Sequence, residues 1–517
     1  MNGADALCDT LLAGGIDTCF ANPGTSEMHF VAALDRKPAM RCVLALFEGV
    51  ATGAADGYGR MLERPAATLL HLGPGLANGL ANLHNARRAR TPLVNIVGDH
   101  STQHLQYDAP LTSDVAALAA PMSHWVRTIR DADEIPKISA QAVERSLGDG
   151  GAVTTLILPA DAAWTKCQAS PVKPETTASL RDVAAEQIRL ASHILQSQGK
   201  RVVLILGGRA LKPEARAAAA RICDATGAGM LAQQSNARLE RGAGRVPIAR
   251  IPYPVEQARA MLDGAGHILL FGATAPVGFF AYPGKPGSAV PENCTVHEIC
   301  SHAEDANLAL RSIADYLNID QTRSVICQRL SQPSLPTGGL DADAVIQTVS
   351  ALMPEHAIVC DETVSSGRKL LQITAGAPPH DMLFLNGGAI GIGLPLATGA
   401  AIACPDRPVI CLQADGSAMY TIQALWTQAR ENLHVISIIF SNRSYALLHQ
   451  ELAKVGAGQA GQNASRLLDI VDPSLDWCKI ACGMGVEATT VKTVRTLADS
   501  LRAALLRNGP FLIEAQI

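Results

Sequence analysis

Two polar residues at the ends of apolar runs are the strongest candidates for chemistry in this chain. Asp415 follows the β-branched run 409–413, and Asn442 follows a second such run, 435–440, 27 residues after Asp415. One helix and one strand fill that interval. Both residues are therefore expected at the carboxyl ends of parallel strands, where open α/β sheets bind ligands. A carboxylate, an amide oxygen and a free backbone carbonyl suit Mg²⁺ or a looser Ca²⁺ shell.

The two residues after Asp415 add anion binding to this pattern. Gly416 lets the backbone approach a phosphate closely, and the amides of Gly416 and Ser417 at a helix start can donate to phosphate oxygens. The alternative is that Asp415-Gly416 is a turn and Asn442 a cap. Because each residue follows a β run at this spacing, we favour a diphosphate held through a divalent metal.

Glu48 is the second candidate. It follows the apolar run 42–47 and begins a stretch of small residues that indicates a helix. A glutamate there could simply be an exposed residue that the helix dipole stabilises. A partly buried glutamate, by contrast, suits acid–base chemistry.

Three α/β blocks must position these residues. Short β-branched runs alternate with helical patterns over 1–165, 185–325 and 340–517, with Pro-rich linkers at 166–179 and 332–339. Helices between apolar strands imply parallel sheets covered on both faces. We therefore predict three consecutive doubly wound parallel-sheet domains.

Composition narrows the partners and the compartment. Net charge is −4, and no basic block or acidic tail is present, which argues against nucleic acid or a membrane surface. The thirteen cysteines include no CxxC pair and are interpreted as reduced thiols of a cytoplasmic protein. The uncharged stretch 387–404 is interpreted as a glycine-rich loop running into a buried helix, not as a membrane span.

These motifs resemble the thiamine-diphosphate (ThDP)-dependent decarboxylase and acetolactate-synthase superfamily. Its signature, Gly-Asp-Gly-Ser followed by Asn-Asn, is matched by Ala414–Ser417 and Ser441-Asn442, with both side-chain ligands kept. Glu48 and the helix ending at 55–58, Ala-Asp-Gly-Tyr, match a second family motif. The resemblance covers all three blocks and is strongest to short acetolactate-synthase-like proteins and to benzoylformate decarboxylase.

The resemblance implies a ThDP site completed by Mg²⁺ or Ca²⁺. Asp415, Asn442 and the main-chain oxygen of Ser444 would be the metal ligands, with Tyr445 a further cofactor contact. Glu48 would hydrogen-bond the pyrimidine ring and favour the imino tautomer that activates the cofactor. Gly388 would offer its carbonyl to the 4′-amino group.

It also implies that Ile390 supports the bent cofactor and that hydroxyls of 361–366 contact the diphosphate. Residues 1–165 would be the pyrimidine-binding domain, 185–325 a central Rossmann-like domain and 340–517 the diphosphate-binding domain. Because the family pairs the first domain of one subunit with the third of another, a homodimer is the minimum and a homotetramer is expected. FAD is not expected, since 207–209 is not a GxGxxG motif.

The substrate pocket is implied by benzoylformate decarboxylase. Thr25, in the sequence Asn-Pro-Gly-Thr-Ser-Glu, takes the place of a serine that binds the substrate carboxylate, and His71 matches a histidine that can shuttle a proton. Pocket-lining positions fall on Pro110, Leu111 and Leu448. A second catalytic histidine has no counterpart in 275–282, which leaves Tyr282 or His104 as substitutes.

The predicted function is a ThDP- and metal-dependent enzyme for a small carbonyl substrate. It would make or break a C–C bond beside a carbonyl, by 2-oxo acid decarboxylation, carboligation or both. One alternative is a lyase of 2-hydroxyketones or 2-hydroxyacyl-CoA. Another is a non-catalytic homologue, against which the retention of Glu48, Asp415 and Asn442 argues.

Overall fold

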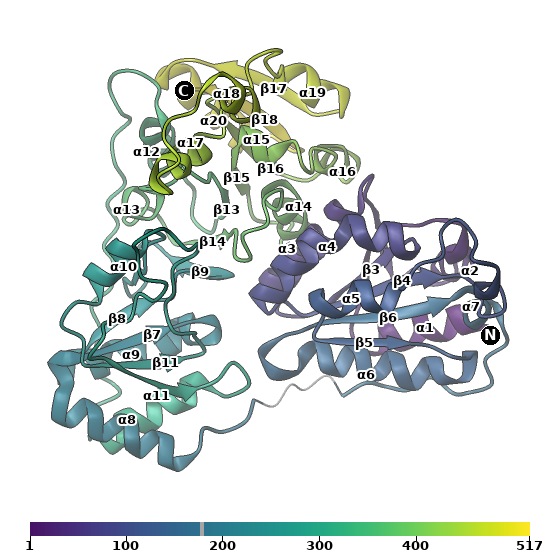
Figure 1. Cartoon of the computed structure of the whole chain (residues 1–517), viewed down its shortest axis with the longest axis horizontal. Coiled ribbons are helices and arrows are strands. Elements are labelled where there is room, and N and C mark those ends of the chain that lie inside the picture. Colours follow the sequence, from purple (N-terminus) through teal and green to yellow (C-terminus); the bar gives the residue numbers. More distant parts are fainter. Residues whose placement is uncertain (176–179) are drawn as a thin grey trace.

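The computed structural model describes residues 1–175 and 180–517; residues 176–179, the end of the linker predicted at 166–179, lie outside the described part. Within the described part the strands form three sheets, each flanked by helices (Figure 1). The predicted α/β class with parallel sheets is confirmed. One strand departs from the expected order, because β9 (Arg238–Arg241) pairs antiparallel with β14 (His380–Phe384) of the third sheet.

The first sheet is six-stranded and parallel, in the order β2-β1-β3-β4-β6-β5. Its strands β3, β4 and β6 are buried along their whole length because helices cover both faces. The strands are β1 Thr18–Asn22, β2 Arg41–Leu44, β3 Ala66–Leu70, β4 Leu93–Asp99, β5 Trp125–Thr128 and β6 Val153–Pro159. The helices are α1 Gly3–Ala13, α2 Met28–Asp35, α3 Glu48–Leu62, α4 Leu72–Ala89, α5 Val115–Ala119, α6 Ile135–Leu147 and α7 Ala160–Trp164.

The second sheet has five parallel strands in the order β10-β8-β7-β11-β12. Its central strand β7, Val202–Leu206, is the run that the sequence predicts there. The other strands are β8 Gly229–Ala232, β10 Ala249–Arg250, β11 His267–Phe271 and β12 Thr295–Cys300. The helices are α8 Ala185–Gln198, α9 Pro213–Thr226, α10 Val255–Met261 and α11 Ala306–Tyr316.

The third sheet has seven strands in the order β17-β18-β16-β15-β13-β14-β9. Its strands besides β9 and β14 are β13 Ile358–Glu362, β15 Val409–Ala414, β16 Val435–Ser441, β17 Glu487–Val491 and β18 Phe511–Gln516. Its helices are α12 Ala342–Leu352, α13 Leu370–Ile373, α14 Gly393–Ala403, α15 Asp415–Ala418, α16 Ala424–Arg430, α17 Ala446–Lys454, α18 Gln462–Leu468, α19 Trp477–Gly483 and α20 Val494–Leu505. β15 and β16 pair in parallel, so their carboxyl ends lie side by side.

Small residues bring the first and third sheets together in one chain. Helix α3 packs on α14, and a Cβ added at Gly57 or Gly399 would lie 2.2 or 1.8 Å from a backbone oxygen of the other helix. No larger residue fits such an approach. The uncharged stretch around α14 is thus a buried interdomain helix, and no helix among the described residues is long and apolar enough to span a membrane.

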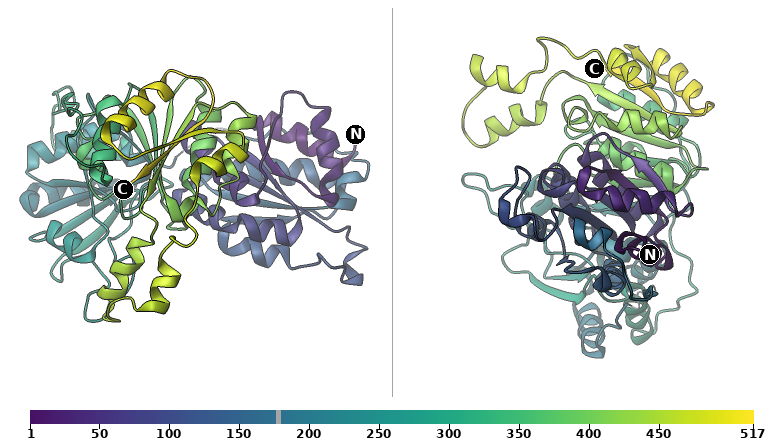
Figure 2. Two further views of the ribbon diagram at one scale, coloured as in Figure 1. Left: turned by 90° about the horizontal axis from the view of Figure 1, so that it is seen from above. Right: turned by 90° about the vertical axis from the view of Figure 1, so that its right-hand side faces the viewer.

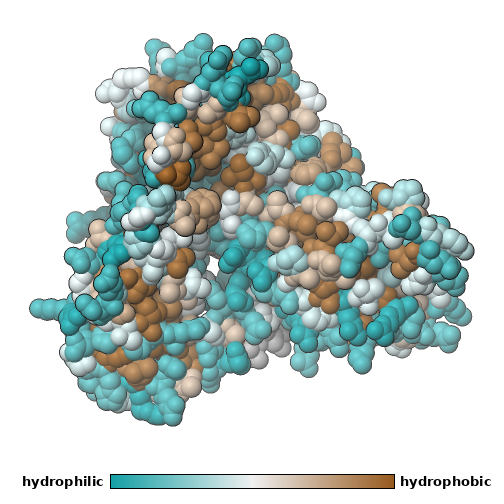
Figure 3. Space-filling model, viewed as in Figure 1, coloured by the Kyte–Doolittle hydropathy of each residue, from teal (hydrophilic) through white to brown (hydrophobic). Residues whose placement is uncertain are grey.

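Helices α17 and α18, unlike α14, are not buried. They project from the edge of the third sheet in both views of Figure 2 and contain no buried residue. Leu448 and Leu467 are 46% and 79% exposed. Figure 3 shows hydrophobic side chains gathered on the same face of this part of the molecule. Each of the two helices therefore exposes a large apolar side chain.

Candidate active site

The two predicted metal ligands lie next to each other at the edge of the third sheet. Asp415 begins α15 directly after β15 and is buried, while Asn442 follows β16. One oxygen of Asp415 accepts from the amide of Gly416 at 2.8 Å, and the other accepts from the amide of Arg443 at 2.6 Å. Burial raises the pKa of the Asp415 carboxyl, which backbone N–H groups counteract. The sheet register thus produces the pairing that the 27-residue spacing predicts.

The loop after Asn442 has a strained but well-anchored backbone. Arg443 has φ +55°, which non-glycine residues seldom adopt, and the amide of Ser444 donates to the Asn442 side-chain oxygen at 3.0 Å. The Ser444 hydroxyl donates to Asp469, and the Tyr445 ring lies over Gly416. Strain of this kind clusters at functional sites. The loop therefore holds Ser444 and Tyr445 beside the candidate metal ligands.

A buried carboxylate holds the glycine loop that precedes α14. Glu362, at the end of β13, accepts from the amides of Gly391 and Gly393 at 2.5 and 2.6 Å. It also accepts from Gln413 at 3.1 Å, whose amide in turn donates to Ser417. Burial raises the pKa of Glu362 to about 7 against these donors. One network therefore couples the glycine loop to the Asp415 helix.

Glu362 is a site residue that sequence reasoning missed. The sequence assigned only the hydroxyls of 361–366 to the cofactor, and the Thr363 hydroxyl instead donates to Asp361 at 2.6 Å. The available signal was an acid at the carboxyl end of a strand, next to a glycine-rich loop. Within that loop Gly388 has φ +85° and Ile390 is half-buried, so a partner molecule could contact both.

In the first sheet, Glu48 and His71 lie on either side of one glycine. Glu48 begins α3, is 9% exposed, and accepts from the Asn78 amide at 3.0 Å. A Cβ added at Gly75 would lie 3.2 Å from a Glu48 oxygen and 3.3 Å from the His71 Cβ. The predicted acid–base groups are thus neighbours, although the sequence separates them by 23 residues.

His71 is paired with a second residue that the sequence analysis missed. Its Nδ1 is 2.7 Å from an oxygen of Glu27, whose side chain is fully buried. The same oxygen accepts from the amide of Gly24 at 2.8 Å, and a Cβ at Gly24 would overlap the His71 ring. Burial raises the pKa of Glu27, and the nearby charge of His71 lowers it. The signal was present, since Glu27 ends the Asn-Pro-Gly-Thr-Ser-Glu motif.

The remaining pocket predictions fall on the surface of the chain. Thr25 lies in a 3₁₀ turn, Thr25–Glu27, and is exposed, as are Pro110, Leu111 and Leu448. The His104 ring packs against Tyr107. Thr25 follows Gly24, which packs against the His71 ring. Pro110, Leu111 and Leu448 have no described contact with Glu48 or Asp415.

The Tyr282 hydroxyl is already held by a hydrogen bond. Its hydroxyl donates to Glu451 of α17 at 2.6 Å, and burial together with Glu451 raises its pKa. The Phe279 ring lies over Gly388, where a Cβ would be 2.6 Å from the ring edge. The segment 275–282, called the middle segment below, therefore places the Phe279 ring against the third sheet's glycine loop.

The two groups of residues stay apart within one chain. Among the described residues, no hydrogen bond or ion pair joins Glu27, Glu48 or His71 to Asp415 or Asn442. The helix α4 does reach the glycine loop, since Asn85 donates to the Ala389 carbonyl at 2.8 Å. The chain thus presents two half-sites on connected supports.

Comparisons with known proteins match both parts of the chain that contain these residues. The family "Thiamine pyrophosphate enzyme, N-terminal TPP binding domain" matches residues 1–120, and "Thiamine pyrophosphate enzyme, C-terminal TPP binding domain" matches residues 367–515. A Mycobacterium tuberculosis relative, IlvX, named as a candidate acetolactate synthase large subunit, is 51% identical, with 100% of this chain and 99% of IlvX covered. The chain belongs to the ThDP-dependent enzyme family.

Further relatives of this ThDP-dependent enzyme share its whole length. Benzoylformate decarboxylase of Pseudomonas aeruginosa is 30% identical, with 98% of this chain and 97% of the relative covered. The solved structure of the ThDP-dependent 4-hydroxybenzoylformate decarboxylase of Rhodococcus jostii superposes with a TM-score of 0.85 at 25% identity, covering 100% and 99% of the two chains. The chain is thus an enzyme of the decarboxylase and acetolactate-synthase type.

Proposed function

We propose that this enzyme acts on a 2-oxo acid with ThDP and Mg²⁺, releasing CO₂ and then forming an aldehyde or joining the acyl carbon to a second carbonyl. The observation that carries the proposal is the cluster of Glu48, His71 and Glu27 around Gly75 and Gly24. It puts two carboxyl groups and an imidazole at one edge of the first sheet. The relatives named for decarboxylation and for acetolactate synthesis support the substrate class.

The donor set of the third sheet fits a hard divalent cation that carries a diphosphate. Asp415 supplies a carboxylate and Asn442 an amide oxygen, and we assign the third position to the Ser444 carbonyl. Gly388, Ile390, Gly416, Ser417 and Tyr445 would contact the cofactor. Bound ThDP supplies a carbon nucleophile that adds to a carbonyl and accepts the electron pair of the broken C–C bond.

The residues of the chain then have separate roles in our proposal. Glu48, held by Asn78, donates a hydrogen bond to the pyrimidine ring of the cofactor. His71, oriented by Glu27, moves a proton to or from the reacting carbon. Thr25 positions the substrate carboxylate, while Pro110, Leu111 and Leu448 shape the pocket.

A second copy of the chain would complete the site. No hydrogen bond or ion pair among the described residues joins the half-sites within one chain, and α17 and α18, which follow Asn442 in the sequence, expose apolar residues. We therefore propose a homodimer as the minimal active unit and a homotetramer as its assembled form. The thirteen cysteines are free, which fits the reducing cytoplasm that we propose as its location.

Two measurements test this proposal. Saturating ThDP with Mg²⁺ should raise the melting temperature of the wild type but not of Asp415→Ala, and Asp406→Ala, a change at an exposed residue of the same domain, should respond like the wild type. A panel of 2-oxo acids and 2-hydroxyketones should then give CO₂ from the former. A cofactor-independent melting temperature would refute the metal site. Aldehyde release from 2-hydroxyketones without CO₂ from any 2-oxo acid would establish the lyase alternative.

A further inference from the structure

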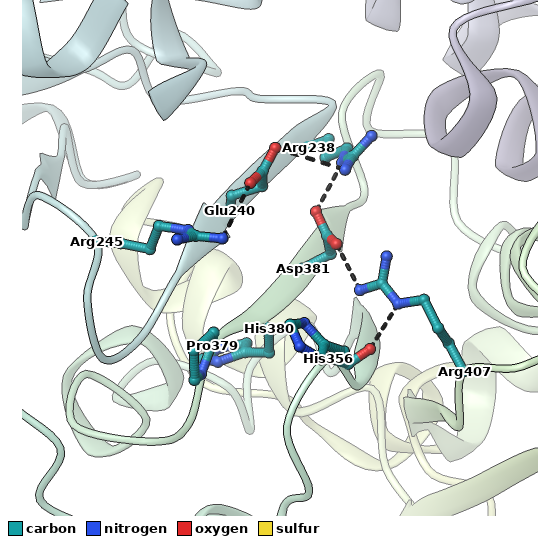
Figure 4. A pocket seen from close by; sticks show the side chains of 8 residues that line it. All are labelled: Arg238, Glu240, Arg245, His356, Pro379, His380, Asp381 and Arg407. Atoms are coloured by element: carbon teal, nitrogen blue, oxygen red, sulfur yellow. Dashed lines mark hydrogen bonds and ion pairs between the residues drawn. The ribbon is translucent and has the colours of Figure 1, made fainter. Parts of the chain in front are cut away.

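A polar pocket lies at the opposite end of the third sheet from Asp415. Its walls include Asp381 and His380 at the amino end of β14, Arg407 just before β15, and Arg238 and Glu240 of β9 (Figure 4). The antiparallel register pairs Asp381 with Glu240, which places β9 across this end. With Arg245, these residues enclose about 150 Å³. Two segments of the chain therefore meet around one cavity.

The charges around this cavity do not balance. Each oxygen of Asp381 is already paired, one with Arg238 at 2.7 Å and the other with Arg407 at 2.6 Å. Glu240 is 3.6 Å from both Arg238 and Arg245, too far for hydrogen bonds. Three guanidinium groups thus share two carboxylates, and the ion pair of Arg245 with Glu240 is a long one, at 3.6 Å.

Two further arginines lie behind the pocket wall. Arg216 is 1% exposed, and its Nε has no hydrogen-bond partner among the described residues. It donates only to the backbone carbonyl of Glu240, and Arg241 donates to Thr374 and to a backbone carbonyl. Burial lowers the pKa of both to about 10. The charge of Glu240 offsets part of the cost of burying Arg216, and an anion in the cavity would offset more of it.

His380 adds a hydrogen-bond acceptor to the positive wall. Its Nδ1 lies 2.7 Å from the carbonyl oxygen of Pro378, which can only accept, so Nδ1 carries the proton. Its Nε2 is then a buried acceptor, and it has no partner among the described residues. The cavity therefore suits a ligand with several anionic oxygens and one O–H group.

We propose that this pocket binds a phosphate group, either as inorganic phosphate or as a small phosphate monoester. The anionic oxygens would lie between Arg238, Arg245 and Arg407, which bind phosphate well because guanidinium is planar and always charged. A protonated oxygen would donate to His380. The ligand would link β9 and the segment after it to Arg407 across this end of the third sheet, and so stabilise the position of β9 there.

The test uses the full-length protein saturated with ThDP and Mg²⁺, so that the cofactor site cannot take the probe. Titration calorimetry and melting temperatures are measured with inorganic phosphate against chloride at constant ionic strength. The wild type should bind phosphate and melt at a higher temperature. Arg245→Gln should weaken binding at least about tenfold, the loss expected for a charge-assisted contact. Arg36→Gln, which breaks an ion pair in the first domain, should change nothing.

Two further measurements distinguish a ligand-binding site from a network of ion pairs that binds no ligand. Glu240→Gln should tighten phosphate binding, because it removes a competing carboxylate. Sulfate, which has no O–H group at neutral pH, should bind more weakly than phosphate, and glycerol 3-phosphate tests the monoester. Absence of phosphate binding in the wild type, unchanged binding in Arg245→Gln, or weaker binding in Glu240→Gln would each overturn the proposal. Equal binding of sulfate would overturn the assignment of phosphate.

Discussion

The two half-sites hold their carboxylates in different ways. In the third sheet, both oxygens of Asp415 and both oxygens of Glu362 accept from backbone amides. In the first sheet, Glu48 has one side-chain partner, Asn78, while one oxygen of Glu27 has no partner among the described residues and the other contacts His71 and accepts from the Gly24 amide. Backbone donors fix the position of a carboxylate. A partner such as the His71 imidazole can itself exchange a proton.

Because of this difference, we expect cofactor binding and turnover to depend on different half-sites. The third sheet has the rigid oxygens that a metal and a diphosphate need, and the first sheet has the groups that can exchange protons. Substitutions in the first half-site should therefore lower the rate and spare cofactor affinity. Substitutions in the third sheet should lower affinity and stability first.

The largest expected effect is that of Glu48→Gln. It keeps the shape of the side chain but removes the acid that would activate the cofactor, so turnover should fall about 10²–10⁴-fold, the usual contribution of acid–base catalysis. Cofactor affinity, measured by calorimetry, should stay within a few fold. Glu63→Gln, at the other end of the same helix, is the matched control. Full activity in Glu48→Gln would show that another residue activates the cofactor.

The sequence predicted the parts of the site that one stretch of chain determines. The strand ends at Asp415 and Asn442 and the helix start at Glu48 follow from local patterns, and the structure has them there. Glu27 and Glu362 could not be found in this way. Their importance depends on partners 44 and 31 residues away, His71 and Gly393, that only the parallel sheets bring near. The insertion of β9 into the third sheet is hidden for the same reason, because its partner β14 lies far along the chain.

Glu362→Gln should weaken the half-site of the third sheet. A side-chain amide cannot accept with both arms, so at least one of the Gly391 and Gly393 amides loses its partner. A buried donor left unpaired costs about 1–3 kcal/mol. We expect a lower free energy of unfolding in urea and weaker ThDP binding. Glu355→Gln, at an exposed position in the same domain, should match the wild type in both.

Glu362 should also make stability depend on pH. Its folded pKa, about 7, lies above the ordinary value of 4.5, so the folded state binds more protons between these values. The contribution of Glu362 to the free energy of unfolding therefore falls as pH rises from about 4.5 to about 7 and is constant above that range. Urea unfolding of the cofactor-free protein across this range should show a slope that Glu362→Gln lacks. An identical slope in both proteins would assign it to other groups.

Glu27→Gln tests whether the first half-site acts on the rate through His71. The amide retains a contact with the ring but cannot stabilise positive charge on it, so we expect kcat to fall about tenfold or more, within the range of proton-transfer effects. The pH profile of kcat/KM should change shape, while the cofactor affinity should not. Glu27→Asp should recover part of the rate. A loss of stability with an unaltered pH profile would mean that Glu27 only supports the fold.

The smallest effect should come from Tyr282→Phe, which decides whether the middle segment supplies a proton. The hydroxyl donates to Glu451, and burial and that carboxylate raise its pKa, so the proton is held rather than exchanged. Losing one such hydrogen bond should cost about 0.5–1.5 kcal/mol of stability and leave the pH–rate profile unchanged. Tyr316→Phe removes a comparable hydroxyl contact, with His193, far from Glu451. If Tyr282→Phe instead removes one limb of the pH–rate profile, Tyr282 is a proton donor. Proton transfer then involves the middle segment as well as the first half-site.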